Sequence, residues 1–142
     1  MSTIKGLCLL ICIIFLTACG QNSISVEISP LGNEMKYKNT RFEVKSGQKV
    51  SLTFKNTATT PVMKHNVVIL TDKNVINEVG TAAITAKNYL PDHPAILAAT
   101  PIVEPGQKAT IEFKAPSSPG EYAFICTYPG HYMMMQGIMV VN

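Results

Sequence analysis

The feature that most constrains this chain is a short stretch near its C-terminus, residues 124–137 (FICTYPGHYMMMQG). It places a thiol at Cys126, an imidazole at His131 and thioethers at positions 133–135 within one loop. A Pro-Gly pair at 129–130 favours a tight turn, because proline sets φ and glycine permits positive φ. Thiolate and imidazole suit copper or zinc and suit magnesium or calcium poorly. The stretch therefore predicts a soft-metal site in a loop between two strands, with the choice among the three methionines open.

The chain begins with a segment typical of export signals. Lys5 provides a positive start, and residues 6–16 (GLCLLICIIFL) form an apolar run. This run is too short to span a bilayer, which needs about 20 apolar residues, and it is typical of a signal-peptide core. We therefore interpret residues 1–18 as a signal peptide, and no second stretch resembles a membrane span.

A cysteine follows the apolar run in the sequence LTAC, residues 16–19. This sequence resembles the lipobox of bacterial lipoproteins, in which the cysteine becomes the acylated first residue after cleavage. The resemblance implies a lipid on Cys19 and a short lipidated tether over residues 19–25, whereas an ordinary secretory signal cut near Ala18 is the alternative. Because Gln21 stands close to Cys19 without the Asp of an inner-membrane retention signal, we expect an outer-membrane anchor.

Cysteine usage and charge narrow the functional classes. Cys8 and Cys12 would leave with the signal and Cys19 would carry lipid, so Cys126 is the only thiol left in an exported chain. It has no partner for a disulfide, which favours a metal ligand over a merely buried thiol. The formal net charge is +3 and the charges are scattered, so nucleic acid is not an expected partner.

Short alternating apolar segments dominate the rest of the chain. In residues 49–55, for example, Val50, Leu52 and Phe54 share one face of a strand. The expected strands are 24–28, 35–38, 41–45, 49–55, 66–70, 108–114, 122–126 and 137–141. Short strands separated by regular turn signals predict one all-β domain over residues 26–142, an antiparallel Greek-key β-sandwich or barrel.

The middle of the chain has a different pattern. Asp72 can cap a helix over residues 73–87, where apolar residues recur at helical spacing. Gly80 interrupts that pattern, so we expect a broken or short helix laid against the sandwich. Residues 89–101 contain three prolines and are expected to form a loop.

A metal site needs more ligands than the Cys126 loop provides, and the chain has three histidines. His65 stands at the entry to an expected strand, and His93 stands in a proline-bounded loop. A strand end is rigid, whereas a proline loop usually lies on the surface. We therefore favour His65 as a ligand and expect His93 to be solvated.

The spacing of Cys126, His131 and Met135 resembles the C-terminal copper loop of azurin within the cupredoxin family. In that loop His follows Cys by five residues and Met follows His by four, as here. The upstream sequence Met63–Asn66 resembles the azurin motif that carries the remaining ligand. The resemblance covers most of residues 24–142 and implies a cupredoxin-like fold with a short helical insertion.

The resemblance also implies a ligand set and a cofactor. His65, Cys126 and His131 would form a trigonal set around one copper ion cycling between Cu(I) and Cu(II), with Met135 as a long axial ligand. The carbonyl of Lys64 would approach from the opposite side as a weak axial contact. Lysine replaces a glycine-like residue there, which is one of this chain's departures from azurin; the others include the lack of tryptophan and of a second structural cysteine.

Neighbouring residues receive roles from the same resemblance. Asn66 and Thr127 match positions that brace the site and lend hydrogen bonding near the thiolate. An apolar patch around the edge of His131 would dock redox partners. Its residues are Met63, Tyr128, Pro129 and Met134.

These implications favour a type 1 copper electron-transfer protein of the bacterial cell envelope. It would be a monomer, anchored to the membrane by lipid on the outer-membrane or periplasmic face. Its partners would be redox proteins such as c-type cytochromes or copper or haem reductases. The alternative is a periplasmic copper-binding or copper-delivery lipoprotein, suggested by the methionines at 133–135. An enzyme is not expected, because three histidines cannot build further metal centres, and a metal-free sandwich leaves Cys126 unexplained.

Overall fold

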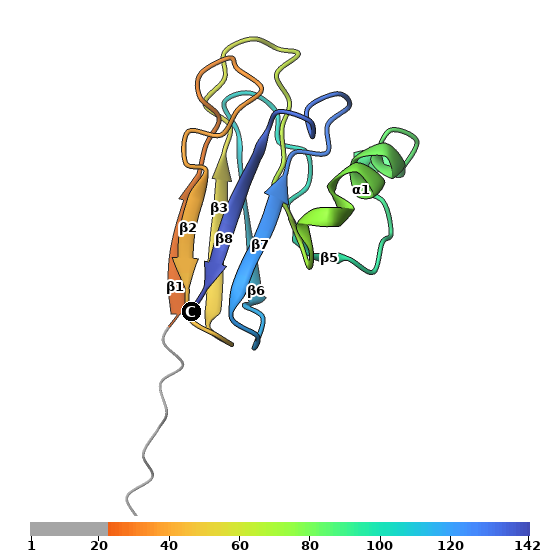
Figure 1. Ribbon diagram of the computed structural model, residues 1–142. Coiled ribbons are helices and arrows are strands. Elements are labelled where there is room, and N and C mark those ends of the chain that lie inside the picture. Colours follow the sequence, from red (N-terminus) through yellow and green to blue (C-terminus); the bar gives the residue numbers. More distant parts are fainter. Residues whose placement is uncertain (1–22) are drawn as a thin grey trace, which may run out of the picture.

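The computed structural model describes residues 23–142, which form a sandwich of two β-sheets with a helical segment on one side (Figure 1). The signal peptide predicted at 1–18 and the lipidation predicted at Cys19 lie outside the described residues. The smaller sheet has the order β1 (Ser23–Ile28), β3 (Lys49–Lys55), β6 (Lys108–Lys114). The larger sheet has the order β2 (Arg41–Val44), β8 (Gln136–Val141), β7 (Gly120–Ile125), β4 (Val68–Leu70), β5 (Ile96–Ala99). This is a two-layer β-sandwich with a short helical insertion, as the sequence predicted.

The sheets are mixed, whereas we expected antiparallel pairing throughout. β1 pairs with β3 in parallel and β2 pairs with β8 in parallel, while the other strand pairs are antiparallel. The reason lies in the path of the chain. Between β1 and β3 it crosses to the other sheet to form β2, so it reverses twice and returns in its original direction.

The core lies between the two sheets and follows the alternation of the strands. Val50, Leu52 and Phe54 of β3 are fully buried, as their shared face predicted. All three residues of β4 are buried because that strand is covered on both faces. Its outer face meets the helical insertion, where Val79 packs with Val68, Leu70 and Ile125 in a second apolar cluster.

The insertion between β4 and β5 forms short helical pieces, as predicted, although its α-helix continues through Gly80 and ends after Ala83. It consists of the 3₁₀ turn η1 (Lys73–Val75), the helix α1 (Ile76–Ala83) and the 3₁₀ turn η2 (Lys87–Tyr89). The side chain of Asp72 accepts a hydrogen bond from the Asn74 amide and so caps the first turn. Within the described residues, no helix is both long enough and apolar enough to cross a membrane.

Several boundaries differ from the sequence pattern. β5 lies within residues 89–101, which we expected to be a loop, because their prolines flank the strand instead of interrupting it. Residues 35–38 form no strand and contribute only the isolated bridge between Pro30 and Tyr37. β1 begins at Ser23, inside the segment predicted as tether.

Candidate metal centre

The three predicted polar ligands meet at the end of the sandwich opposite to the C-terminus, where β7 leads into the loop before β8 (Figure 1). His65 precedes β4 and is held by a two-way backbone bridge with Val103 (N···O 3.3 and 2.7 Å). Cys126 follows β7, and its amide donates to the Met135 carbonyl at 3.1 Å, which closes the loop. His131 lies in the turn of that loop. Long-range backbone pairing therefore fixes both His65 and Cys126.

The donor atoms form a nearly regular triangle. The two imidazole Nδ1 atoms of His65 and His131 are 3.1 Å apart. Cys126 Sγ lies 3.8 Å from the first and 3.7 Å from the second. A circle through points with these separations has a radius of about 2.1 Å, close to usual metal–nitrogen and metal–sulfur bond lengths. The residues present fit a single three-coordinated soft metal ion. Among the described residues, no other three His, Cys, Asp or Glu side chains lie close enough together to share one ion.

Burial sets the protonation of the site before metal binds. It lowers the pKa of His65 to about 4, with the neighbouring His131 adding to the shift, and it also lowers the pKa of His131. Both rings are therefore neutral at pH 7, each with a lone pair available. Burial raises the pKa of Cys126 to about 11, although backbone amides of Asn66 and Tyr128 that donate to sulfur oppose this. The cysteine is a thiol at pH 7 until a metal displaces its proton.

The far side of the His65 ring also bears on metal binding. Its Nε2 is buried and has no hydrogen-bond partner among the described residues. Ligation through Nδ1 leaves the ring proton on this nitrogen. Metal-binding histidines usually donate that proton to a carbonyl or carboxylate, so the environment of His65 is unusual in this respect.

The structure separates the three consecutive methionines. Met135 is fully buried and packs in the same core cluster as Cys126, and its amide donates to the His131 carbonyl at 2.8 Å. Met133 and Met134 are exposed, by 64% and 53%. Among these three residues, only Met135 therefore has its side chain buried inside the domain.

Asn66 and Thr127 each follow a candidate ligand, and they are bonded to each other. Asn66 Nδ2 donates to Thr127 Oγ1 and the Thr127 amide donates to Asn66 Oδ1, both at 2.8 Å. Sequence reasoning missed Tyr37, whose buried hydroxyl donates to the Asn66 carbonyl at 2.6 Å. No local pattern could have found it, because Tyr37 lies in a segment without regular pairing.

His131, around which the apolar patch was predicted, is 6% exposed, and Tyr128 packs against its ring at 5.0 Å between centroids. Of the predicted patch residues, Met63, Tyr128 and Pro129 are partly buried, and Met134 is exposed. Val62 is also strongly exposed next to Met63 and was not predicted.

His93 lies outside the donor triangle, as predicted, but its side chain is only 16% exposed and not freely solvated. Its Nε2 lies 3.0 Å from Glu78 Oε1, and its Nδ1 accepts a hydrogen bond from the Ala95 amide at 3.2 Å. The ring therefore links α1 to the segment that enters β5.

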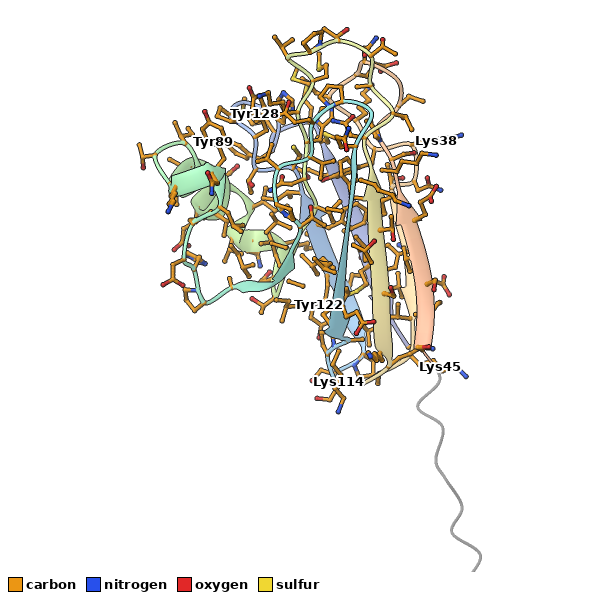
Figure 2. All side chains as sticks on the ribbon, turned by 180° about the vertical axis from the view of Figure 1, so that it is seen from behind. Lys38, Lys45, Tyr89, Lys114, Tyr122 and Tyr128 are labelled. Carbon is orange, nitrogen blue, oxygen red and sulfur yellow. The ribbon has the colours of Figure 1, made fainter. Side chains whose placement is uncertain are left out.

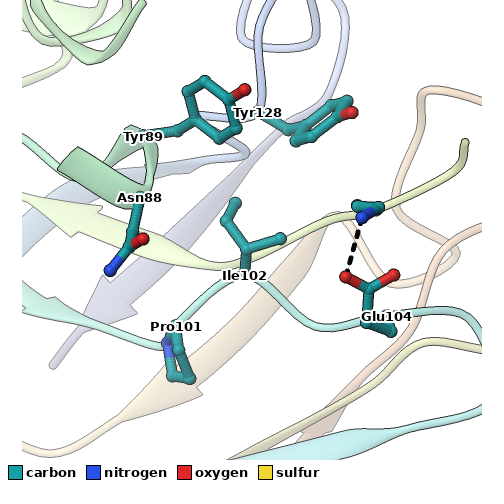
Figure 3. Close-up of a pocket in the computed structure, with 7 residues that line it drawn as sticks. Asn88, Tyr89, Pro101, Ile102, Glu104 and Tyr128 are labelled. Atoms are coloured by element: carbon teal, nitrogen blue, oxygen red, sulfur yellow. Dashed lines mark ion pairs between the residues drawn. The ribbon is translucent and has the colours of Figure 1, made fainter. Parts of the chain in front are cut away.

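A groove of about 390 Å³ opens beside the site (Figure 3). Lys64, which precedes His65, lies on one side of it, and its ammonium pairs with Glu104 at 2.8 Å. This pairing raises the pKa of Lys64. Tyr128 and Tyr89 also line the groove, and their rings meet edge to face with centroids 5.3 Å apart. Figure 2 shows the two rings together at the end of the molecule that carries the metal loop.

A two-sheet sandwich with one cysteine and two neutral histidines converging at one end defines a blue copper electron-transfer protein, or cupredoxin. The sequence matches the family model of copper binding proteins of the plastocyanin/azurin family over residues 24–142. The chain therefore belongs to the plastocyanin/azurin family, as the sequence resemblance indicated.

Individual relatives agree with this assignment. Auracyanin-A of Chloroflexus aurantiacus is 36% identical over 87% of this chain and 77% of its own length. Its solved structure, described as a "blue" copper protein, has a TM-score of 0.79 over 85% of this chain and 100% of that chain. The structure of auracyanin from Roseiflexus castenholzii, reduced with dithionite, is 40% identical with a TM-score of 0.77, covering 83% of this chain and 96% of that one. Outer membrane protein H.8 of Neisseria meningitidis is 33% identical over 66% of this chain and 54% of its own length.

Proposed function

We propose that this chain is a type 1 copper electron carrier of the cell envelope, in which His65, Cys126 and His131 would hold one copper ion and Met135 would be a further, weaker ligand. The observation that carries the proposal is the triangle of donor atoms, whose size fits one ion. The burial of Met135 in the same core cluster as Cys126 supports its role as a ligand. The Lys64 carbonyl is proposed as a weak contact from the opposite side.

Copper bound to these donors supplies one-electron chemistry, because thiolate and imidazole are acceptable ligands for both Cu(I) and Cu(II). The protein's contribution is to hold the two imidazole nitrogens and the cysteine sulfur in fixed positions. His65 is fixed by its bridge to Val103, and the Asn66–Thr127 bonds tie the two ligand-bearing segments together. A donor set that needs little movement between oxidation states offers little resistance to electron transfer.

Electrons would enter and leave at the edge of His131. His131 is the candidate ligand that keeps some solvent exposure, 6%, whereas His65 and Cys126 are fully buried. The apolar patch around it, with Met134 exposed, suits brief docking of redox proteins such as c-type cytochromes or copper or haem reductases. We propose that the carrier works as a monomer.

We propose a lipid anchor at Cys19 and a location on the outer membrane or the periplasmic face of the envelope. The LTAC sequence directly after the apolar run supports this. The relative named Outer membrane protein H.8 is consistent with such a location.

We further propose that the chain is not an enzyme, since four ligands from the protein would leave no position for a substrate. The same arrangement argues against copper delivery. A delivery site has to exchange its ion, whereas these donors are buried and held by backbone pairing.

Voltammetry of the copper-loaded protein combined with a chelator challenge tests this function. We expect one reversible one-electron wave, with copper retained in both oxidation states when a competing chelator is added. Cys126→Ser should lose the wave. Rapid loss of copper to the chelator by the wild-type protein would instead indicate a delivery protein.

A further inference from the structure

The helical insertion touches the metal loop at two places, one on each side of His131. It lies against the outer face of the larger sheet, beside the loop that joins β7 and β8 (Figure 1). The loop presents a tyrosine three residues before His131 and another directly after it, Tyr128 and Tyr132. Each of these rings packs against a residue of the insertion.

The first contact joins Tyr132 to Gly80 of α1. A Cβ atom placed on Gly80 would overlap the Tyr132 ring, with three ring carbons as its nearest neighbours. Tyr132 also packs on the cluster that holds α1 to the sheet through Val79. A glycine inside a helix is less stable than an alanine there, and the close approach of this ring gives a reason for it.

The second contact is a series of aromatic rings that leads from Tyr89 through Tyr128 to His131. Tyr89 of η2 meets Tyr128 edge to face, at 5.3 Å between centroids and 80° between planes. Tyr128 in turn meets the His131 ring at 5.0 Å and 65°. Pairs in this geometry are worth about 0.5–1.5 kcal/mol beyond their burial.

The backbone of the insertion is strained where it presents Tyr89. Asn88 and Tyr89 both adopt the left-handed conformation, with φ of 55° and 56°, and neither is glycine. Such positions are costly and persist where surrounding contacts hold them. Among the described non-glycine residues, these are the two with positive φ, and they lie next to the metal loop.

Two contacts within the insertion join its first half to its second half. The Glu78 carboxylate on α1 meets His93 Nε2 at 3.0 Å, and the Thr71 amide donates to the Ala95 carbonyl at 2.8 Å. These links join the two ends of the insertion and keep its two contacts with the loop at a fixed separation.

We propose that the insertion is a clamp that fixes the His131 ring from both sides of the metal loop, with Gly80 and Tyr89 as positioning residues. The proposal rests on the assignment of His131 as a ligand. The clamp holds the loop in its binding shape before metal arrives, and it slows the departure of His131 from the bound ion.

Hydrogen exchange of the metal-free protein tests the clamp without relying on copper. The amides of His131, Met134 and Met135 form the hydrogen bonds that close the turn of the metal loop. Tyr89→Ala should accelerate their exchange about two- to tenfold, the range that one aromatic pair supports. Tyr89→Phe keeps the ring and should restore protection. Leu97→Ala on β5, at an exposure of 38% against 36% for Tyr89, is the matched control and should leave these amides unchanged.

A double-mutant cycle tests the Gly80 contact. Gly80→Ala should accelerate exchange in the loop, because its Cβ displaces Tyr132. In the Tyr132→Ala background, Gly80→Ala should leave exchange in the loop unchanged or slow it. The only effect that remains there is the higher helix propensity of alanine. In the reduced copper-loaded protein, Tyr89→Ala should also speed copper release to a chelator about two- to tenfold.

Exchange in Tyr89→Ala equal to that in Leu97→Ala, or a Gly80→Ala effect unchanged by removing Tyr132, would overturn the clamp. These results are independent of the proposed electron carrier. That function fails if the wild-type protein shows no thiolate–copper absorption, whatever the exchange rates.

Discussion

The side chain of Asn66 forms both of its hydrogen bonds with Thr127, one to the amide and one to the hydroxyl, each at 2.8 Å. Asn66 follows His65 and Thr127 follows Cys126, so this pair joins segments that lie far apart in the sequence. Both residues are buried, and Tyr37 extends the network by donating to the Asn66 carbonyl. The network sets the separation of two candidate ligands through atoms that need not touch metal.

Removing this link should weaken the fold and disturb the site. Asn66→Ala keeps the amide that donates to Cys126 sulfur but leaves the Thr127 amide buried without a partner. We expect a loss of about 3 kcal/mol in the free energy of unfolding of the metal-free protein, measured with urea. Asn33→Ala is the control, because Asn33 accepts bonds from the amides of Thr59 and Thr60 at an exposed site. An equal loss in both variants would contradict the role given to Asn66.

The metal-free protein should lose stability in mild acid. The folded pKa of His65 is about 4 and lies below its usual value of 6.5, so the unfolded chain binds a proton that the folded chain does not. The stabilisation is complete above pH 6.5 and is lost as the pH falls to about 4, by about 3 kcal/mol for this ring. The lowered pKa of His131 also makes the folded protein less stable as the pH falls.

Unfolding free energies measured in urea between pH 7.5 and 4 check this, with His65→Gln as the comparison. The difference in stability between wild type and variant should shrink as the pH falls. A difference that stays constant over this range would contradict the lowered pKa of His65.

Charge placed on the apolar patch should slow electron exchange between copies of the protein. Met134 is exposed beside His131, so Met134→Glu would bring two like charges together when two patches meet. We expect electron self-exchange, measured by NMR line broadening in mixtures of the two oxidation states, to fall at least about tenfold at low salt. Leu97→Glu adds the same charge on β5 and should have little effect. Similar slowing by both variants would contradict electron transfer through the apolar patch around His131.

The sequence predicted each of the three ligands from its local setting, and the resemblance to azurin brought His65 together with Cys126 and His131. The thiol and the second histidine share one loop, and the first histidine stands at the start of a strongly apolar strand. The burial of these three side chains and the distances between their donor atoms became visible only in the fold. The choice of Met135 over its two neighbours came from the resemblance to azurin, and local pattern alone left that choice open.

The features missed by the sequence depend on contacts between distant segments. β5 forms because β4 offers it an edge, and nothing within residues 89–101 signals that edge. Parallel pairing of β1 with β3 depends on where β2 crosses to the other sheet. Gly80 looked like a defect in a helix, and its reason is a ring more than fifty positions away, Tyr132.

The visible absorption spectrum of residues 23–142 after addition of Cu(II), repeated on Cys126→Ser, tests the central claim most directly. Serine retains the size of the side chain and removes the sulfur, and circular dichroism checks that the variant folds. The account predicts an intense blue thiolate-to-copper band at one copper per chain, absent from the variant. A weak band that persists in Cys126→Ser would contradict a type 1 site built on Cys126.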